Sequence, residues 1–115
     1  MIRLAAAAIM VAGYDEGIAF YSAIGFETTA DEDQGRKRWV TMRAPAGGSE
    51  MVLAVGADAP MARVARFLET DDFAAAAARI EAAGGAFEEA PRIEPYGRVA
   101  VWRDPFGNRW DLIER

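Results

Sequence analysis

The stretches DEGIAFYSAIGFE, residues 15–27, and DDFAAAAARIEAAGGAFEE, residues 71–89, decide the fold. Each opens on acidic residues, continues with apolar side chains at helical spacing, and ends at glycine followed by a short segment containing phenylalanine. This pattern is typical of a helix that ends and leads into a strand. The glycines Gly25 and Gly85 lie about 60 positions apart, a period that suggests a structural repeat.

The segments around these two helices alternate in the same order. Each helix is expected to follow an apolar strand and to precede a short strand, a loop and a two-stranded hairpin. The expected strands are residues 4–11, 26–28, 39–43, 50–55, 64–69, 87–89, 99–103 and 109–113, and the helices are residues 15–23 and 72–83. The sequence therefore predicts an α+β fold of two tandem βαβββ modules, and a generic α+β sandwich with similar halves is the alternative.

The predicted boundaries follow from the linker between the halves. Residues 56–61 lack a regular pattern and contain glycine and proline. We expect one domain over residues 1–115, with a first module over residues 1–56 and a second over residues 62–115. A chain of 115 residues is long enough to bury a core without disulfide or metal support.

The composition excludes several kinds of chemistry. The chain has no cysteine, which rules out disulfides and thiolate catalysis, and no histidine, the commonest general base and metal ligand. A net charge of −5 argues against nucleic acid as a partner. Arg3 interrupts the first apolar segment, which is too short to cross a bilayer. We expect a cytoplasmic protein, and the alanine and arginine bias suggests a bacterial source.

Three stretches resemble one protein family. They are VAGYDEGIAFYSAIGF at residues 11–26, FLETDDF at residues 67–73, and YGRVAVWRDPFGNRWDLI at residues 96–113. They are similar to the opening, the second module and the closing hairpin of the vicinal oxygen chelate superfamily, which contains glyoxalases, bleomycin resistance proteins and extradiol dioxygenases. The resemblance covers nearly the whole chain and implies curled mixed sheets around a cavity.

The resemblance also implies where a metal would bind. The metal enzymes of the superfamily place four ligands, usually histidine or glutamate, at inward strand positions that match Ala6, Ala54, Ala65 and Asp111 here. Only Asp111 has a ligating side chain, whereas catalytic metal sites need about three protein ligands. The resemblance therefore implies a metal-free branch with no cofactor, although a weak site made by Asp111, Glu69 and water is an alternative.

Strand alternation predicts which side chains line the cavity. Successive residues of a strand point to opposite faces, so assigning Trp110 and Leu112 to the core sends Arg109 and Asp111 to the other face. The same rule, with Val99 and Val101 assigned to the core, turns Arg98 and Trp102 toward the cavity. The expected ligand-binding residues are Trp39, Phe67, Glu69, Tyr96, Arg98, Trp102, Arg109 and Asp111.

Each of these residues also has a structural explanation. Trp39, Phe67 and Trp102 can belong to the core, and Asp111 can form an ion pair with Arg98 or Arg109. Glu69 can be solvated at a strand end, and Tyr96 can either cover the pocket or lie in an exposed loop. Asp104 is expected to fix the turn before the last strand rather than to take part in chemistry.

Two classes of function follow from this pocket, and a protein-binding or regulatory module without a ligand is a further hypothesis. The first is a metal-independent small-molecule-binding protein, like the bleomycin resistance branch, that sequesters a drug or metabolite. The second is an enzyme, either a metal-free one that uses Asp111 as general acid or base, or a glyoxalase-like lyase or isomerase. The sequence leaves enzymatic activity undecided. The resemblance further implies a homodimer.

Overall fold

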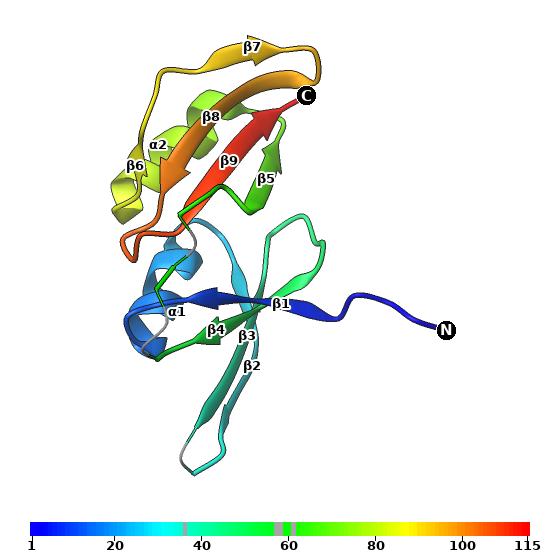
Figure 1. Ribbon diagram of the computed structural model, residues 1–115, viewed down its shortest axis with the longest axis vertical. Coiled ribbons are helices and arrows are strands. Elements are labelled where there is room, and N and C mark those ends of the chain that lie inside the picture. The colour runs from blue at the N-terminus through cyan, green and yellow to red at the C-terminus, as the bar shows by residue number, and fades with distance from the viewer. Residues whose placement is uncertain (36, 57–58, 61) are drawn as a thin grey trace. The chain divides into compact units, whose positions relative to one another are not determined.

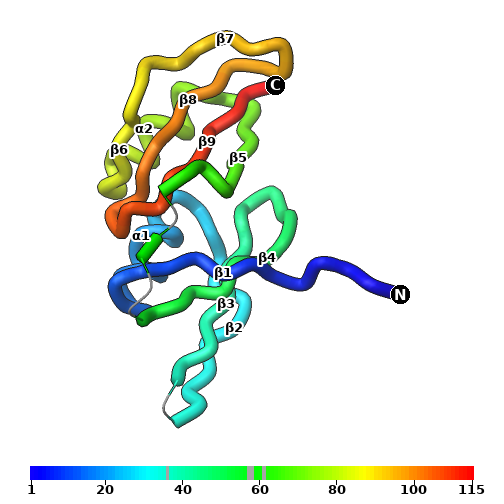
Figure 2. The backbone as a smooth tube through the Cα atoms, in the orientation of Figure 1, coloured from blue at the N-terminus to red at the C-terminus, as the bar shows by residue number. Residues whose placement is uncertain are grey.

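A computed structural model describes residues 1–35, 37–56, 59–60 and 62–115 (Figures 1 and 2). The chain divides into two compact units, Met1–Ala59 and Pro60–Arg115. Each unit holds one helix and one mixed sheet. Most of the expected linker, residues 57–58 and 61, lies outside the described residues. Among the helices of the described part, none is long and apolar enough to cross a membrane.

The first unit forms a four-stranded sheet in the order β1-β4-β3-β2. Strands β1 and β4 run parallel, and the other neighbours run antiparallel. A short N-terminal stretch extends away from this sheet before β1 (Figures 1 and 2). The elements are β1 (Ala6–Met10), α1 (Tyr14–Ala23), β2 (Glu27–Asp33), β3 (Arg38–Arg43) and β4 (Glu50–Ala54).

The second unit repeats this topology with one extra strand. Its sheet has the order β5-β9-β8-β6, with β5 parallel to β9, and β7 also pairs with β8. The elements are β5 (Arg66–Thr70), α2 (Phe73–Ala83), β6 (Ala86–Phe87), β7 (Arg92–Glu94), β8 (Gly97–Arg103) and β9 (Arg109–Glu114). In both units the first strand pairs in parallel with the last, so the predicted fold of two βαβββ modules is confirmed.

Two local predictions were wrong. The segment between the expected strands at residues 26–28 and 39–43 was expected to be a loop, but β2 continues through Asp33. Its polar side chains are tolerated because β2 lies at the edge of the sheet and Asp31 binds Arg38 on the neighbouring strand at 2.8 Å. Strand β7 was not expected, because a strand of three residues is too short to show an alternating pattern in the sequence.

Local capping fixes where α2 begins. The Asp72 carboxylate accepts a hydrogen bond from the backbone N–H of Ala75 at 3.1 Å, which identifies Asp72 as the N-cap. The backbone N–H of Phe73 donates to the carboxylate of Glu114, on β9, at 2.6 Å. The helix therefore starts where both a local carboxylate and the last strand supply acceptors.

A tight turn joins β8 to β9 as expected. One carboxylate oxygen of Asp104 accepts hydrogen bonds from the backbone N–H groups of Phe106 and Asn108, both at 2.9 Å. Its other oxygen accepts from the side-chain amide of Asn108 at 2.8 Å. Asp104 and Asn108 are buried, so the carboxylate satisfies donors that water cannot reach.

Each sheet packs one face against its own helix. In the first unit this face carries Ile9, Val40, Met42, Met51 and Leu53, all buried. In the second unit it carries Trp102, Trp110 and Leu112, with Phe73 and Ile80 contributed by α2. Trp102 and Trp110 stack with ring centroids 5.4 Å apart and an angle of 11° between the rings.

The expected orientation of β8 was wrong. Residues opposite each other in an antiparallel pair share a face, and Trp102 lies opposite Trp110 while Val101 lies opposite Asp111. Arg98, Ala100 and Trp102 therefore belong to the helix side, and Val99 and Val101 to the other. Val99 is nevertheless fully buried, so apolar character alone could not distinguish the two faces of this strand.

Candidate functional site

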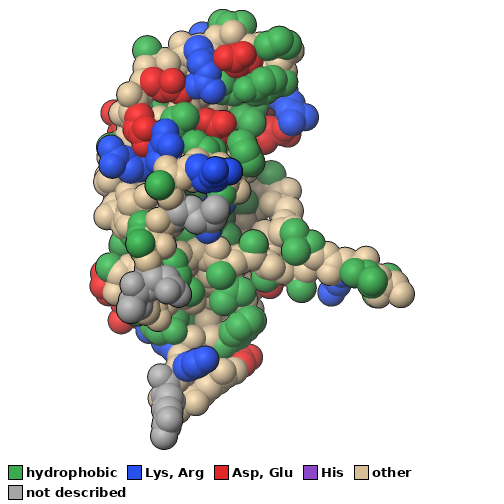
Figure 3. Space-filling model, viewed as in Figure 1, with side chains coloured by type: hydrophobic (Ala, Val, Ile, Leu, Met, Phe, Trp, Pro, Cys, Tyr) green, Lys and Arg blue, Asp and Glu red, His purple; other side chains and the backbone are tan. Residues whose placement is uncertain are grey.

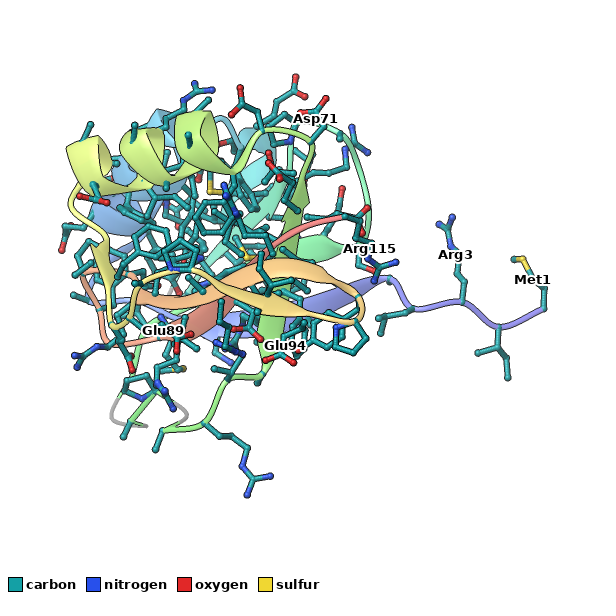
Figure 4. The ribbon with its side chains drawn as sticks, turned by 90° about the horizontal axis from the view of Figure 1, so that it is seen from above. Met1, Arg3, Asp71, Glu89, Glu94 and Arg115 are labelled. Atoms are coloured by element: carbon teal, nitrogen blue, oxygen red, sulfur yellow. The ribbon has the colours of Figure 1, made fainter. Side chains whose placement is uncertain are left out.

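The candidate site is the face of the second sheet that lies opposite α2. We call it the Asp111 face. Pairing in register places Phe67 beside Asp111 and Glu69 beside Ile113 on the neighbouring parallel strand. The face is made by Phe67, Glu69, Val99, Val101, Arg103, Arg109, Asp111 and Ile113. In Figure 4, Glu89 and Glu94 lie on this same side of the sheet, away from α2.

Asp111 is the acidic residue at the centre of this face. It is 9% exposed, and its Oδ1 atom is buried without a hydrogen-bond partner among the described residues. Burial raises the pKa of the Asp111 carboxyl above its ordinary value. Arg92 opposes this rise, Glu89 adds to it, and Arg109 opposes it more weakly. The sheet thus holds a carboxyl group with one buried oxygen to which no described residue donates a hydrogen bond.

The arginines near Asp111 are already bound to other carboxylates. Arg109 donates from Nε and Nη2 to the two carboxylate oxygens of Glu88 at 2.9 and 3.0 Å, and from Nη1 to the backbone oxygen of Ala62 at 3.0 Å. The Arg109 hydrogen bond holds the pKa of the Glu88 carboxyl below its ordinary value, against the opposing effect of burial. Arg103 also approaches Glu88, at 3.3 Å.

A second ion-pair group lies on the other side of Asp111. Arg92 binds Glu94 at 3.0 Å and also Glu89. The Glu89 carboxylate accepts a hydrogen bond from the backbone N–H of Val101 at 2.9 Å, which ties the segment before β7 to β8. Figure 3 shows the resulting mixture of acidic and basic side chains on the second unit. Arg92 and Glu89 act on the Asp111 carboxyl electrostatically, and in the described part of the chain no group donates a hydrogen bond to its Oδ1.

Asp111→Asn is expected to stabilise the protein at neutral pH, because asparagine never carries the charge that burial penalises. The stability that a carboxyl group with a raised pKa contributes is fully present below its ordinary value of 3.8. That contribution is lost as the pH rises through the higher pKa of the folded protein. The variant should unfold a few degrees above the wild type at pH 7, and the difference should shrink toward zero below about pH 4.

The matched control for this prediction is Glu69→Gln. Glu69 lies on the same face, but its side chain is mostly exposed and binds Arg115 at 3.0 Å. An exposed ion pair of this kind contributes little to stability. Thermal unfolding of both variants from pH 3 to 8 tests the idea, and equal effects for the two would contradict a special burial cost at Asp111.

Phe67 gives the Asp111 face an exposed aromatic surface. Its side chain is 60% exposed although it lies beside a buried residue in the sheet. Large exposed apolar groups next to a buried polar atom are typical of ligand sites. Phe67, Glu69, Arg109 and Asp111 are therefore placed on one face, as the sequence predicted.

Three other predicted residues lie elsewhere. Trp102 is fully buried against Trp110, and Arg98 lies over the ring of Phe73 on the helix side, 5.8 Å from its centre. Their expected place on the cavity face was wrong, because the register of β8 turns them toward α2. Tyr96 is half exposed in the turn between β7 and β8.

Trp39 lies in the first unit, on the sheet face opposite α1. It is 42% exposed and shares this face with Ala6, Thr41 and Ala54, as strand alternation predicted. The hydroxyl groups of Thr29 and Thr41 lie 2.6 Å apart there. This face is mostly apolar and has no buried carboxylate among its described residues.

Sequence patterns did not reveal Glu88, Glu89 and Arg92, which form the ion pairs near Asp111. They follow the short strand β6 or lie in β7, where no hydrophobic alternation shows which face of the sheet a side chain lies on. The only signal was the charge pattern EEAPR at residues 88–92.

The residues present do not fit the metal site of related enzymes. Alanine occupies three of the four positions, namely Ala6, Ala54 and Ala65. Within the described part of the chain, no three acidic, histidine or cysteine side chains are grouped so as to hold a metal ion. Alanine supplies no ligand atom, so Asp111 would have to bind the ion almost alone.

Comparison with known proteins identifies the family. The model of the Glyoxalase/Bleomycin resistance protein/Dioxygenase superfamily matches residues 3–112. The chain belongs to this superfamily. A relative from Shewanella frigidimarina (strain NCIMB 400), described as an uncharacterized protein, is 35% identical over 120 residues, covering 93% of this chain and 89% of the relative.

Solved structures of the glyoxalase/bleomycin resistance superfamily share the whole fold. A member from Sphaerobacter thermophilus DSM 20745 is 25% identical, with a TM-score of 0.87 and coverage of 100% of this chain and 98% of that one. TnmS3, an antibiotic binding protein from Streptomyces sp. CB03234, is 26% identical, with a TM-score of 0.82 and coverage of 99% and 96%. The similarity thus extends over both modules of this superfamily member.

Proposed function

We propose that the protein is a metal-independent small-molecule-binding protein that sequesters a drug or metabolite on the Asp111 face. The observation that carries the proposal is the buried Oδ1 of Asp111, which has no hydrogen-bond partner among the described residues and lies beside the exposed ring of Phe67. A binding site needs an apolar surface and a few polar groups that fix orientation. The likeness to TnmS3, which is an antibiotic binding protein, supports sequestration.

Binding and chemical recovery together test this proposal. The purified protein is titrated with a panel of aromatic antibiotics by calorimetry, and each bound compound is then recovered and analysed by mass spectrometry. At least one compound should bind with micromolar affinity or better and should be recovered unchanged. Binding of none of them, or recovery of a chemically altered compound, would argue against sequestration.

A pair of variants locates the binding surface. Phe67→Ala removes the exposed ring on the Asp111 face and should weaken binding about tenfold, equivalent to about 1.4 kcal/mol. Ile93→Ala is the control, because Ile93 is also exposed but pairs with Arg98 and so lies on the other side of the sheet. Equal loss of affinity in the two variants would place the ligand elsewhere.

The raised pKa of Asp111 favours a second candidate, a metal-free enzyme that uses this residue as general acid or base. A carboxyl group that retains its proton closer to neutral pH is better suited to proton transfer. In that case a compound would be recovered altered, and Asp111→Asn would abolish the change while retaining affinity. A glyoxalase-like lyase or isomerase is less well supported, because alanines replace three of its ligand positions.

We further propose that the protein acts as a homodimer in the cytoplasm. Members of this superfamily commonly pair to complete their cavities, and within the second unit α2 lies on the side of the sheet opposite the Asp111 face. Light scattering of the purified protein should give twice the chain mass of 12.5 kDa. A mass near that of one chain at micromolar concentration would contradict this assembly.

A further inference from the structure

The Oδ1 atom of Asp111 is buried and has no hydrogen-bond partner among the described residues. Leaving a buried acceptor without a donor is costly, and such groups are rare in native proteins. The arginines that affect Asp111 electrostatically, Arg92 and Arg109, make their hydrogen bonds to Glu88, Glu89, Glu94 and the backbone of Ala62. Asp111 thus lies within the electrostatic influence of two arginines, while no residue in the described part of the chain donates a hydrogen bond to its Oδ1.

The charge balance of this group is negative. Asp111, Glu88, Glu89 and Glu94 provide four carboxylates, and Arg92, Arg103 and Arg109 provide three guanidinium groups. Three positive and four negative charges leave one negative charge when Asp111 is ionised. A ligand that brings one positive charge would neutralise the group, whereas an anionic ligand would add to the imbalance.

Asp111 is mostly buried but reaches the surface in part, because the residue is 9% exposed. The ring of Phe67, beside it in register, provides an exposed apolar surface next to it. An aromatic ring is also a favourable neighbour for an ammonium group.

From this geometry we propose that Asp111 selects ligands that carry a protonated amine. The amine N–H donates to the carboxylate of Asp111, and the apolar part of the ligand lies against Phe67. This inference rests on the proposed binding function and adds the chemical class of its ligand, an aromatic or apolar ammonium compound. Neutral analogues still contact Phe67 but lose the charge-assisted hydrogen bond.

Three small probes that share a naphthalene ring and carry a cationic, a neutral or an anionic polar group test the selection. They are 1-naphthylmethylamine, 1-naphthalenemethanol and 1-naphthoate, titrated separately and followed by protein-observed NMR at pH 7. The amine should bind the wild type about tenfold more tightly than the alcohol, because a charge-assisted hydrogen bond is roughly twice as strong as a neutral one. The naphthoate should bind most weakly.

Two variants distinguish selection of the amine by Asp111 from attraction of the amine by the overall negative charge of the protein. Asp111→Asn should reduce the preference for the amine over the alcohol to about twofold or less while retaining affinity for the alcohol. Glu81→Gln, which removes an exposed carboxylate on α2, outside the Asp111 face, should leave the preference unchanged. Loss of the preference in both variants equally would mean that overall negative charge attracts the amine, and would overturn the role of Asp111.

The remaining outcomes separate this inference from the proposed function. If amine and alcohol bind the wild type equally, the selection by Asp111 is wrong but small-molecule binding stands. If none of the three probes shifts resonances of the Asp111 face at millimolar concentration, that face is not a binding site and both proposals fail. Preserved amide spectra of each variant show that it is folded.

Discussion

Trp102→Ala is expected to lower the free energy of unfolding by about 3–5 kcal/mol, the usual cost of removing a large buried aromatic side chain. Trp102 is fully buried and stacks on Trp110 between β8 and α2. The substitution leaves a cavity and removes the ring pair, which by itself contributes about 0.5–1.5 kcal/mol. Urea denaturation followed by far-ultraviolet circular dichroism measures the effect.

The control for this prediction is the same substitution at Trp39. Trp39 is 42% exposed on the first sheet, so Trp39→Ala should cost less than about 1 kcal/mol. If Trp102→Ala prevents folding, Trp102→Phe provides a milder test and should show an intermediate loss of stability. Similar losses for Trp102→Ala and Trp39→Ala would mean that Trp102 faces a cavity, as the sequence alone suggested.

Gly97→Ala is expected to be the most damaging small substitution in the second unit. Gly97 has a φ of 141°, which L residues with a side chain rarely adopt, and this strain alone costs about 1–3 kcal/mol. A Cβ atom there would lie 2.3 Å from the backbone oxygen of Glu114 and 3.1 Å from its carbonyl carbon. Backbone cannot rotate aside as a side chain can, so β9 must separate locally from β8.

Comparison with Gly48→Ala separates the cost of backbone strain from the cost of the steric clash at Gly97. Gly48 also has a positive φ, 103°, but no atom lies within 4 Å of a Cβ built there. Gly48→Ala should therefore show only the conformational cost, about 1 kcal/mol or somewhat more. Gly97→Ala should exceed it by at least about 1 kcal/mol in urea denaturation, because its steric clash with β9 adds to that cost. Equal effects would show that β8 and β9 accommodate the added methyl group.

The repeat could be predicted because the residues that begin and end its helices and turns act on nearby positions of the chain. Acidic residues at helix starts, glycines at helix ends and the turn beginning at Asp104 act within a few positions of the chain. The hydrogen bonds that Asp104 makes to Phe106 and Asn108 are of this kind. Such signals are visible in a single sequence, so the order of the elements was predicted nearly completely.

Which face of β8 packs against α2 could not be predicted from the sequence, because both faces of the strand are apolar. Val99 and Trp102 lie on opposite sides, and both are fully buried. Alternation assigns faces only when one side is polar. The register against β9, which decides the question, depends on residues about ten positions away and on how tightly the turn closes.

The candidate site was only partly predictable for a related reason. Asp111 was singled out by its place in a family motif, and strand alternation then placed Phe67 and Glu69 on its face. The ion pairs around it depend on β7, whose position is set by pairing with β8 rather than by its own sequence. The position of such a segment depends on its pairing with another strand, so its own sequence carries no pattern that predicts it.

The pairing of β5 with β9 also has a consequence for biosynthesis. Strand β9 lies between β5 and β8, yet it is the last strand of its unit along the chain. While the ribosome is still making residues 109–114, β5 has no neighbour and α2 has no complete surface to cover. The second unit is therefore expected to assemble late and in one step, and nascent chains stalled before residue 109 should remain sensitive to protease.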